Sequence, residues 1–143
     1  MERVKVQISK SVEETLKAGE RLAALLSPGD IVLLMGDMGA GKTHLVKGFA
    51  RFFGIAAEQV QSPTFSLVHE YPGKFPLYHI DAYRIRDFRE AREAGFEEYL
   101  NGEGIVFVEW PEKIEELLPP GCIKVELRHK GSTMREIRVH PDR

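Results

Sequence analysis

The feature of this sequence that most constrains its fold is a short apolar run that leads directly into a glycine-rich turn. Residues 31–35 are all apolar, and they lie between Asp30 and Gly36. A run of this length between turn residues predicts a strand buried on both faces, as in parallel sheets that are covered by helices. Beyond the turn, residues 42–53 carry apolar side chains at helical spacing. This strand, turn and helix predict an α/β fold.

Hydrophobic periodicity predicts the remaining elements. A capping box of Ser11 and Glu14 starts a helix that ends before Pro28. Further helices are expected at residues 87–100 and 111–118, and further strands at residues 4–8, 65–71, 76–83, 104–109, 123–129 and 134–140. Two pairs of these strands flank short turns and predict antiparallel hairpins. We therefore expect a mixed sheet, parallel in part, with helices on both faces.

Length and composition narrow the class of protein. The 143 residues suit one domain over residues 1–143, and 43% apolar with 29% charged residues is ordinary globular composition. No apolar run is long enough to span a membrane, and no export signal is visible, so we expect a cytoplasmic protein without a membrane partner. The single cysteine, Cys122, excludes an internal disulfide and is expected in the core. A net charge of −2 argues against binding DNA by charge alone.

The turn at residues 36–43 matches the phosphate-binding pattern G-x-x-x-x-G-K-[ST] at every fixed position. A glycine-rich turn that runs into a helix supplies converging backbone N–H donors, and lysine and threonine supply a charge and a metal ligand. The residues that this motif predicts to bind the nucleotide are Asp37, Met38, Gly39, Ala40, Gly41, Lys42 and Thr43. The motif predicts a nucleoside triphosphate with Mg²⁺, which we take to be ATP, and a fold like that of P-loop NTPases.

Two carboxylates can complete such a site. Glu109 ends the apolar residues 105–108, and Asp81 ends the less apolar residues 77–80. We assign Glu109, with Thr43, to the metal ion and Asp81 to the attacking water, although the two roles could be exchanged.

Other residues allow two interpretations each. Thr64 follows Pro63 and either senses the γ-phosphate from a movable segment or simply begins a strand. Trp110 is either a lid over apolar surface or a contact for a partner. His69 and His79 have no evident metal-ligand partners, so we interpret them as structural.

Charged segments also leave alternatives open. Arg84 and Arg86 either contact phosphate or RNA, or they pair with Asp87 and Glu90 in solvent. Residues 123–143 hold six Lys or Arg against three acidic residues, which indicates either a solvated face or a surface that docks RNA or an acidic partner.

Four separated motifs together resemble one family. They are Gly36-Asp37-Met38-Gly39-Ala40-Gly41-Lys42-Thr43, Ser62-Pro63-Thr64-Phe65, His79-Ile80-Asp81-Ala82-Tyr83-Arg84 and Val108-Glu109-Trp110-Pro111. In this order they resemble the bacterial TsaE family, small ATPases required for the threonylcarbamoyladenosine modification of tRNA. The resemblance implies weak ATP hydrolysis in a complex with the TsaB and TsaD proteins. Contact with tRNA itself stays open.

The resemblance also implies roles for individual residues. It makes Thr43 and Glu109 metal-site residues, Asp81 catalytically essential and Thr64 switch-like, so that the expected catalytic set is Asp81, Lys42 and Thr64. It further implies that Trp110 is functionally sensitive and that Glu112 and Arg135 lie near the nucleotide.

Two other classes of function share the phosphate-binding loop. In a small-molecule kinase Asp81 would act as the base, but the chain is short and lacks an evident arginine-rich lid. In a nucleotide-dependent switch the chain would perform no chemistry. No Asn/Thr-Lys-x-Asp segment that would read guanine is present, which disfavours GTP.

Overall fold

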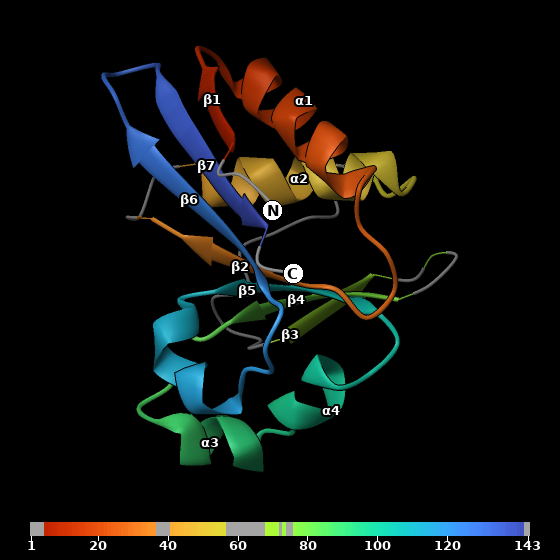
Figure 1. Cartoon of the computed structure of the whole chain (residues 1–143). Helices are drawn as coiled ribbons and strands as arrows, with labels where there is room; N and C mark the ends of the chain where they lie inside the picture. Colours follow the sequence, from red (N-terminus) through yellow and green to blue (C-terminus); the bar gives the residue numbers. More distant parts are fainter. Residues whose placement is uncertain (1–4, 37–40, 57–67, 72, 74–75, 142–143) are drawn as a thin grey trace.

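The computed structural model describes residues 5–36, 41–56, 68–71, 73 and 76–141, which form one mixed sheet between two layers of helices (Figure 1). Its strands are β1 (Lys5–Ser9), β2 (Ile31–Met35), β3 (Val68–Tyr71), β4 (Leu77–Asp81), β5 (Ile105–Glu109), β6 (Ile123–His129) and β7 (Arg135–Pro141). Its helices are α1 (Val12–Ala23), α2 (Lys42–Phe52), α3 (Phe88–Glu93), α4 (Phe96–Leu100) and the 3₁₀ helix η2 (Pro111–Leu117).

The centre of the sheet is parallel and its margins are antiparallel. The strand order is β1-β7-β6-β2-β5-β4-β3. Strand β2 pairs in parallel with both β5 and β6, and β4 pairs in parallel with β5. The hairpins β3–β4 and β6–β7 add the antiparallel margins, and β1 pairs with β7. The mixed sheet that the sequence predicts is therefore confirmed.

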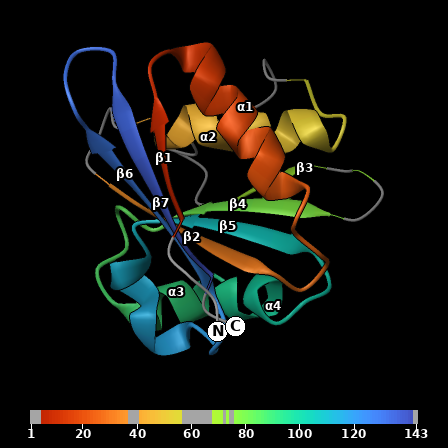
Figure 2. The same ribbon diagram turned by 45° about the horizontal axis from the view of Figure 1, so that its top comes forward.

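Helices cover both faces of the sheet, as predicted. Helices α1 and α2 lie on one face, and α3, α4 and η2 lie on the other, a division that two views of the chain show (Figures 1 and 2). The side chains of β2 point alternately to the two faces of the sheet and contribute to a hydrophobic core on each face. Val32 and Leu34 pack under α2, whereas Ile31 and Leu33 pack toward η2. Its continuously apolar sequence thus follows from burial on both sides.

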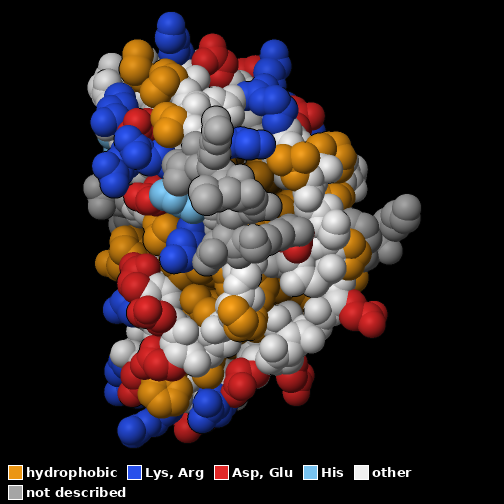
Figure 3. Space-filling view, viewed as in Figure 1, with side chains coloured by type: hydrophobic (Ala, Val, Ile, Leu, Met, Phe, Trp, Pro, Cys, Tyr) orange, Lys and Arg blue, Asp and Glu red, His pale blue; other side chains and the backbone are white. Residues whose placement is uncertain are grey.

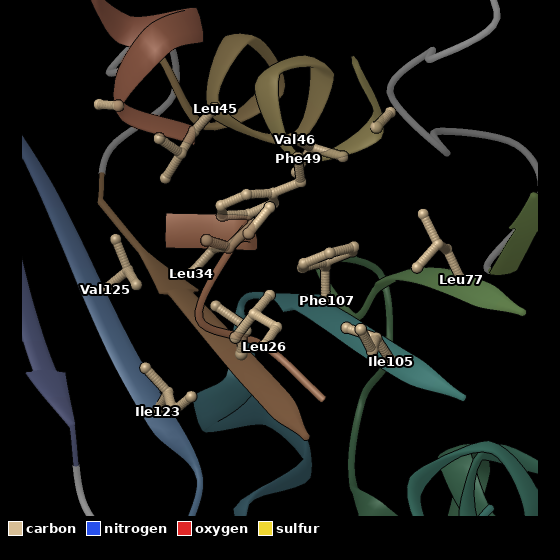
Figure 4. Packing of buried hydrophobic residues seen from close by; sticks show 14 of the residues in the cluster. Leu26, Leu34, Leu45, Val46, Phe49, Leu77, Ile105, Phe107, Ile123 and Val125 are labelled. Carbon is tan, nitrogen blue, oxygen red and sulfur yellow. The ribbon is translucent and has the colours of Figure 1, made fainter. Parts of the chain in front are cut away.

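The first core anchors the helix that follows the phosphate-binding motif. Leu45 and Phe49 of α2 are fully buried against the sheet, next to Leu34 (Figure 4). The ring of Phe49 stacks on Phe107 of β5 with centroids 4.5 Å apart. This packing fixes the position of α2 relative to the carboxyl ends of the strands.

Helices α1 and α2 meet at two glycines. A side chain on Gly48 would overlap the Leu16 carbonyl oxygen, and a side chain on Gly19 would overlap the Leu45 carbonyl oxygen. The missing Cβ atoms allow the two backbones to approach closely, so α1 closes the outer side of α2.

Three predicted elements differ in detail from the structure. The helix predicted at residues 87–100 is two helices, because Gly95 adopts a left-handed conformation with φ of 83° and ends α3. Strand β4 ends at Asp81 rather than at residue 83, since the Asp81 carboxylate accepts a hydrogen bond from the Tyr83 N–H and turns the chain. The segment predicted as a helix at residues 111–118 is the 3₁₀ helix η2.

The expectation that Cys122 lies in the core is confirmed. Cys122 is buried, and its thiol donates to the Pro119 carbonyl oxygen over 3.2 Å. Within the described ranges, the helices are all too short or too polar to cross a membrane.

Candidate active site

The start of α2 lies at the carboxyl end of the buried strand β2. Two glycines of the phosphate-binding motif have a positive φ, which is 145° at Gly36 and 103° at Gly41. Gly41 is the N-cap of α2, and no side chain caps the described first turn. Backbone N–H groups there point out of the helix, as an anion-binding turn requires. The predicted residues Asp37, Met38, Gly39 and Ala40 lie outside the described residues.

Lys42 is a buried cation at this turn. Only 6% of the residue is exposed. Its Nζ donates to the Gly36 carbonyl oxygen over 2.7 Å and lies 4.2 Å from the centroid of the Trp110 ring. A buried ammonium group is costly unless it is paired, and these two contacts compensate for part of that cost. The Lys42 side chain is therefore held between Gly36 and the Trp110 ring.

Trp110 reaches Lys42 through an unusual backbone conformation. It follows β5 directly with φ of 58°, the left-handed region that a bulky side chain rarely adopts. Its ring also packs against Tyr83, with centroids 5.0 Å apart. Trp110 therefore joins the ends of β4 and β5 to the lysine of α2, which the sequence could not reveal.

The two predicted carboxylates lie side by side at the ends of neighbouring strands. Asp81 ends β4 and Glu109 ends β5, and the register of these parallel strands pairs the two residues. Glu109 is also paired with Leu34 of β2, two residues before Gly36. Both carboxylates thus lie at the edge of the sheet from which the phosphate-binding loop leaves, the usual ligand-binding edge of α/β proteins.

The two carboxylates have different surroundings. Glu109 is only 5% exposed, and its Oε2 accepts a hydrogen bond from the His79 ring, whose Nε2 lies 2.6 Å away. Asp81 is half-buried, and its pKa is raised first by burial and also by the Glu109 carboxylate. The Tyr83 N–H, His79 and Lys42 oppose that rise in pKa. Asp81 therefore takes up a proton more readily than an ordinary exposed aspartate does.

The structure describes three of the four remaining predicted site residues: Thr43, Arg135 and Glu112. Thr43 is half-buried in the first turn of α2. Arg135 of β7 approaches the same turn, since its Nε is 4.0 Å from the point where a Cβ on Gly41 would lie. Glu112 is exposed in η2, two residues after Trp110. Thr64 lies outside the described residues.

One contact near the site was not predicted from the sequence. His79, which the sequence suggests is structural, is the hydrogen-bond partner of Glu109. The signal available was its position two residues before Asp81, which places both side chains on one face of a strand. What the sequence lacked was the pairing of β4 with β5.

Charged side chains of both signs lie on the visible face (Figure 3). Lys and Arg side chains gather on the side of the β6–β7 hairpin, which exposes Arg128 and Lys130. Away from the site, Arg86 pairs with Glu90 over 3.1 Å, one of the two alternatives for this arginine.

The sequence matches a known family over most of its length. The pattern of the family described as threonylcarbamoyl adenosine biosynthesis protein TsaE aligns with residues 9–137. Relatives named tRNA threonylcarbamoyladenosine biosynthesis protein TsaE occur in several bacteria. The Bacillus subtilis protein is 44% identical over 126 residues, 87% of this chain and 78% of that protein. The Treponema pallidum protein is 37% identical over 132 residues, 92% of this chain and 97% of that protein.

A crystal structure has the same architecture. Bacillus subtilis YdiB superposes on this chain with a TM-score of 0.82 and 35% sequence identity. The match covers 100% of this chain and 88% of that one. The likeness therefore extends over the fold as well as the sequence.

Proposed function

The chain belongs to the TsaE family of tRNA threonylcarbamoyladenosine biosynthesis proteins, and from this premise we propose that it binds ATP with Mg²⁺ and hydrolyses it weakly. The hydrolysis would serve the modification of tRNA in the cytoplasm through a complex with the TsaB and TsaD proteins. The observation that carries the proposal is the buried Lys42 beside the paired carboxylates Asp81 and Glu109.

The described residues suit this ligand chemically. The Thr43 hydroxyl and the carboxylates of Glu109 and Asp81 are hard oxygen donors, the kind that Mg²⁺ prefers. Within the described ranges, no group of three or more His, Cys, Asp and Glu side chains could hold a metal ion. A site of this kind suits an ion shared with phosphate oxygens, because Mg²⁺ is commonly held by one or two protein ligands and a nucleotide.

Each residue has a distinct task in the proposed reaction. Lys42 binds the β- and γ-phosphates by charge and by hydrogen bonds, for which it would leave the Gly36 carbonyl oxygen. Asp81 accepts a hydrogen bond from the attacking water and orients it, and Thr43 with Glu109 would hold the metal ion. Bound Mg²⁺ would neutralise negative charge on the phosphates. The rate of hydrolysis would depend on the partner proteins.

Two substitutions separate binding from chemistry. Lys42→Ala removes charge-assisted hydrogen bonds worth about 1.5–3 kcal/mol each. The loss of one such bond should lower ATP affinity by about 10- to 100-fold. Asp81→Ala should preserve affinity within a few-fold and reduce hydrolysis by about 10²–10⁴-fold. Calorimetric titration with a non-hydrolysable ATP analogue and a phosphate-release assay measure the two effects.

The matched control is Lys47→Ala, which removes a second lysine from α2 away from its first turn. It should leave affinity and hydrolysis nearly unchanged. Wild-type affinity in Lys42→Ala would refute the assigned loop, and preferential binding of GTP in competition would refute the choice of nucleotide.

The role in assembly needs a separate test. The protein is combined with TsaB, TsaD, ATP and tRNA, and the number of modification turnovers is counted with and without this chain. We expect multiple turnovers only with the wild-type chain. Turnover that is independent of the chain, or hydrolysis that the partners leave unaffected, would contradict the assembly role.

A further inference from the structure

His79 and Glu109 form a buried pair beneath the candidate metal site. His79 is fully buried in β4, Glu109 is 5% exposed at the end of β5, and Nε2 lies 2.6 Å from Oε2. Because an ionised carboxylate can only accept, the ring donates through Nε2. This bond joins residues 30 positions apart in the sequence and depends on the β4–β5 pairing.

The other ring nitrogen argues against a purely structural role. His79 Nδ1 is buried, and no hydrogen-bond partner for it exists among the described residues. A buried polar atom without a partner costs stability, and a buried His–Glu pair is itself weak evidence for stability. An apolar side chain would fill the position between His69 and Phe107 in the register without that cost. The bond to Glu109 is what the histidine provides.

We propose that His79 is a positioning residue that orients the Glu109 carboxylate for the metal ion. By occupying Oε2, the ring prevents rotation of the carboxylate and leaves Oε1 as the oxygen for the metal. Hydrogen bonds of this kind to metal-binding side chains commonly decide metal affinity. This inference rests on the proposed function, in which Glu109 helps to hold Mg²⁺.

The test compares two substitutions that treat the donor differently. His79→Phe keeps a ring of similar size and removes the N–H donor, whereas His79→Gln keeps an N–H donor near the position of Nε2. The control, His140→Phe, removes a bond of the same type at the surface, where His140 Nε2 lies 2.8 Å from Glu126 Oε1. Each variant is titrated with a non-hydrolysable ATP analogue, once with Mg²⁺ and once with a chelator.

The ratio of the two affinities is the readout, because a merely structural defect lowers both affinities together. In His79→Phe we expect the enhancement by Mg²⁺ to fall about 10–100-fold, with little change in the affinity measured with chelator. His79→Gln should recover most of the enhancement, and His140→Phe should keep all of it. Full enhancement in His79→Phe, or an equal loss in both titrations, would overturn the proposal.

Two outcomes separate this inference from the proposed function. If the wild-type chain binds the analogue equally with and without Mg²⁺, the metal site itself is refuted and the role of His79 with it. If the wild-type chain shows the enhancement and His79→Phe retains it, only the positioning role fails.

A measurement without substitution covers the case in which His79→Phe does not fold. Nitrogen-15 NMR of the wild-type histidine rings is recorded with the analogue, first with chelator and then with Mg²⁺. The His79 ring signals should shift on adding Mg²⁺, while those of His140 should stay in place. Unmoved His79 signals would overturn the proposal.

Discussion

The contact between α1 and α2 makes a quantitative prediction for Gly48→Ala. The added Cβ would overlap the Leu16 carbonyl oxygen and lie 3.0 Å from Gly19 Cα. A Cβ normally lies about 3.5 Å or more from other heavy atoms, and the Leu16 oxygen is the closer of the two obstacles, so the helices must separate by about 1 Å or more. Neither obstacle is a side chain that could rotate away, since both belong to the backbone of α1.

The size of the effect is the difference of two terms. Overpacking costs about 1–3 kcal/mol, and we expect the upper end of that range because the backbone must move. Replacing a helical glycine by alanine returns about 1 kcal/mol of helix propensity. The free energy of unfolding should therefore fall by about 2 kcal/mol, which corresponds to a decrease in Tm of about 6 °C for a chain of this size.

The function should respond much less than the stability. Helix α2 is held against the sheet by Phe49, whereas α1 lies on the outside, so α1 is the element that moves. Lys42 at the start of α2 should keep its place, so nucleotide affinity should change by less than about three-fold.

Thermal unfolding by circular dichroism and nucleotide titration measure both quantities. Lys47→Ala, in the same turn of α2, is the control and should change Tm by no more than about 2 °C. Gly19→Ala should resemble Gly48→Ala, and the double variant should lose less than the sum, because one separation of the helices accommodates both methyl groups. An unchanged or raised Tm for Gly48→Ala would refute the close contact.

Two further predictions concern the site itself. Because burial and the Glu109 carboxylate raise the pKa of Asp81, its ionised form destabilises the fold once the pH rises above the ordinary pKa of 3.8 and through the raised value. Asp81→Asn should therefore raise Tm at about pH 7 and lose that gain near pH 4. The measurement is thermal unfolding at both pH values. Equal gains in Tm at the two pH values would show that the charge of Asp81 is not the cause. Gly41→Ala meets only ordinary contacts of 3.6–4.0 Å, so its cost is the positive φ and should be about 1–2 kcal/mol in urea unfolding. A cost well above 3 kcal/mol would indicate a steric contact instead.

Much of the fold follows from local patterns in the sequence. The apolar residues of β2, the capping box at Ser11 and the turns of both hairpins identify elements without reference to distant residues. Boundaries were less certain where two local preferences compete. Residues 87–100 carry a helical pattern throughout, yet Gly95 ends α3 because its left-handed conformation allows the chain to turn back.

The candidate site likewise has a part that the sequence predicts and a part that only the folded sheet shows. The motif at residues 36–43 and the carboxylates Asp81 and Glu109 could be named from the sequence, because each directly follows or ends a recognisable strand. Their nearness to one another was expected only because a phosphate-binding loop needs a second carboxylate at the end of a neighbouring strand. The register of β4 and β5, which pairs Asp81 with Glu109, is a property of the folded sheet.

The sequence by itself determined that this chain has a glycine-rich turn matching the phosphate-binding pattern between a buried strand and a helix, because eight adjacent residues suffice to define that pattern. Only the tertiary structure decided which side chains from other elements lie near it. The Trp110 ring over Lys42 and the His79 bond to Glu109 both join separate elements. Strand order and register bring such residues together, and no local pattern specifies either, since both emerge from the packing of the whole sheet.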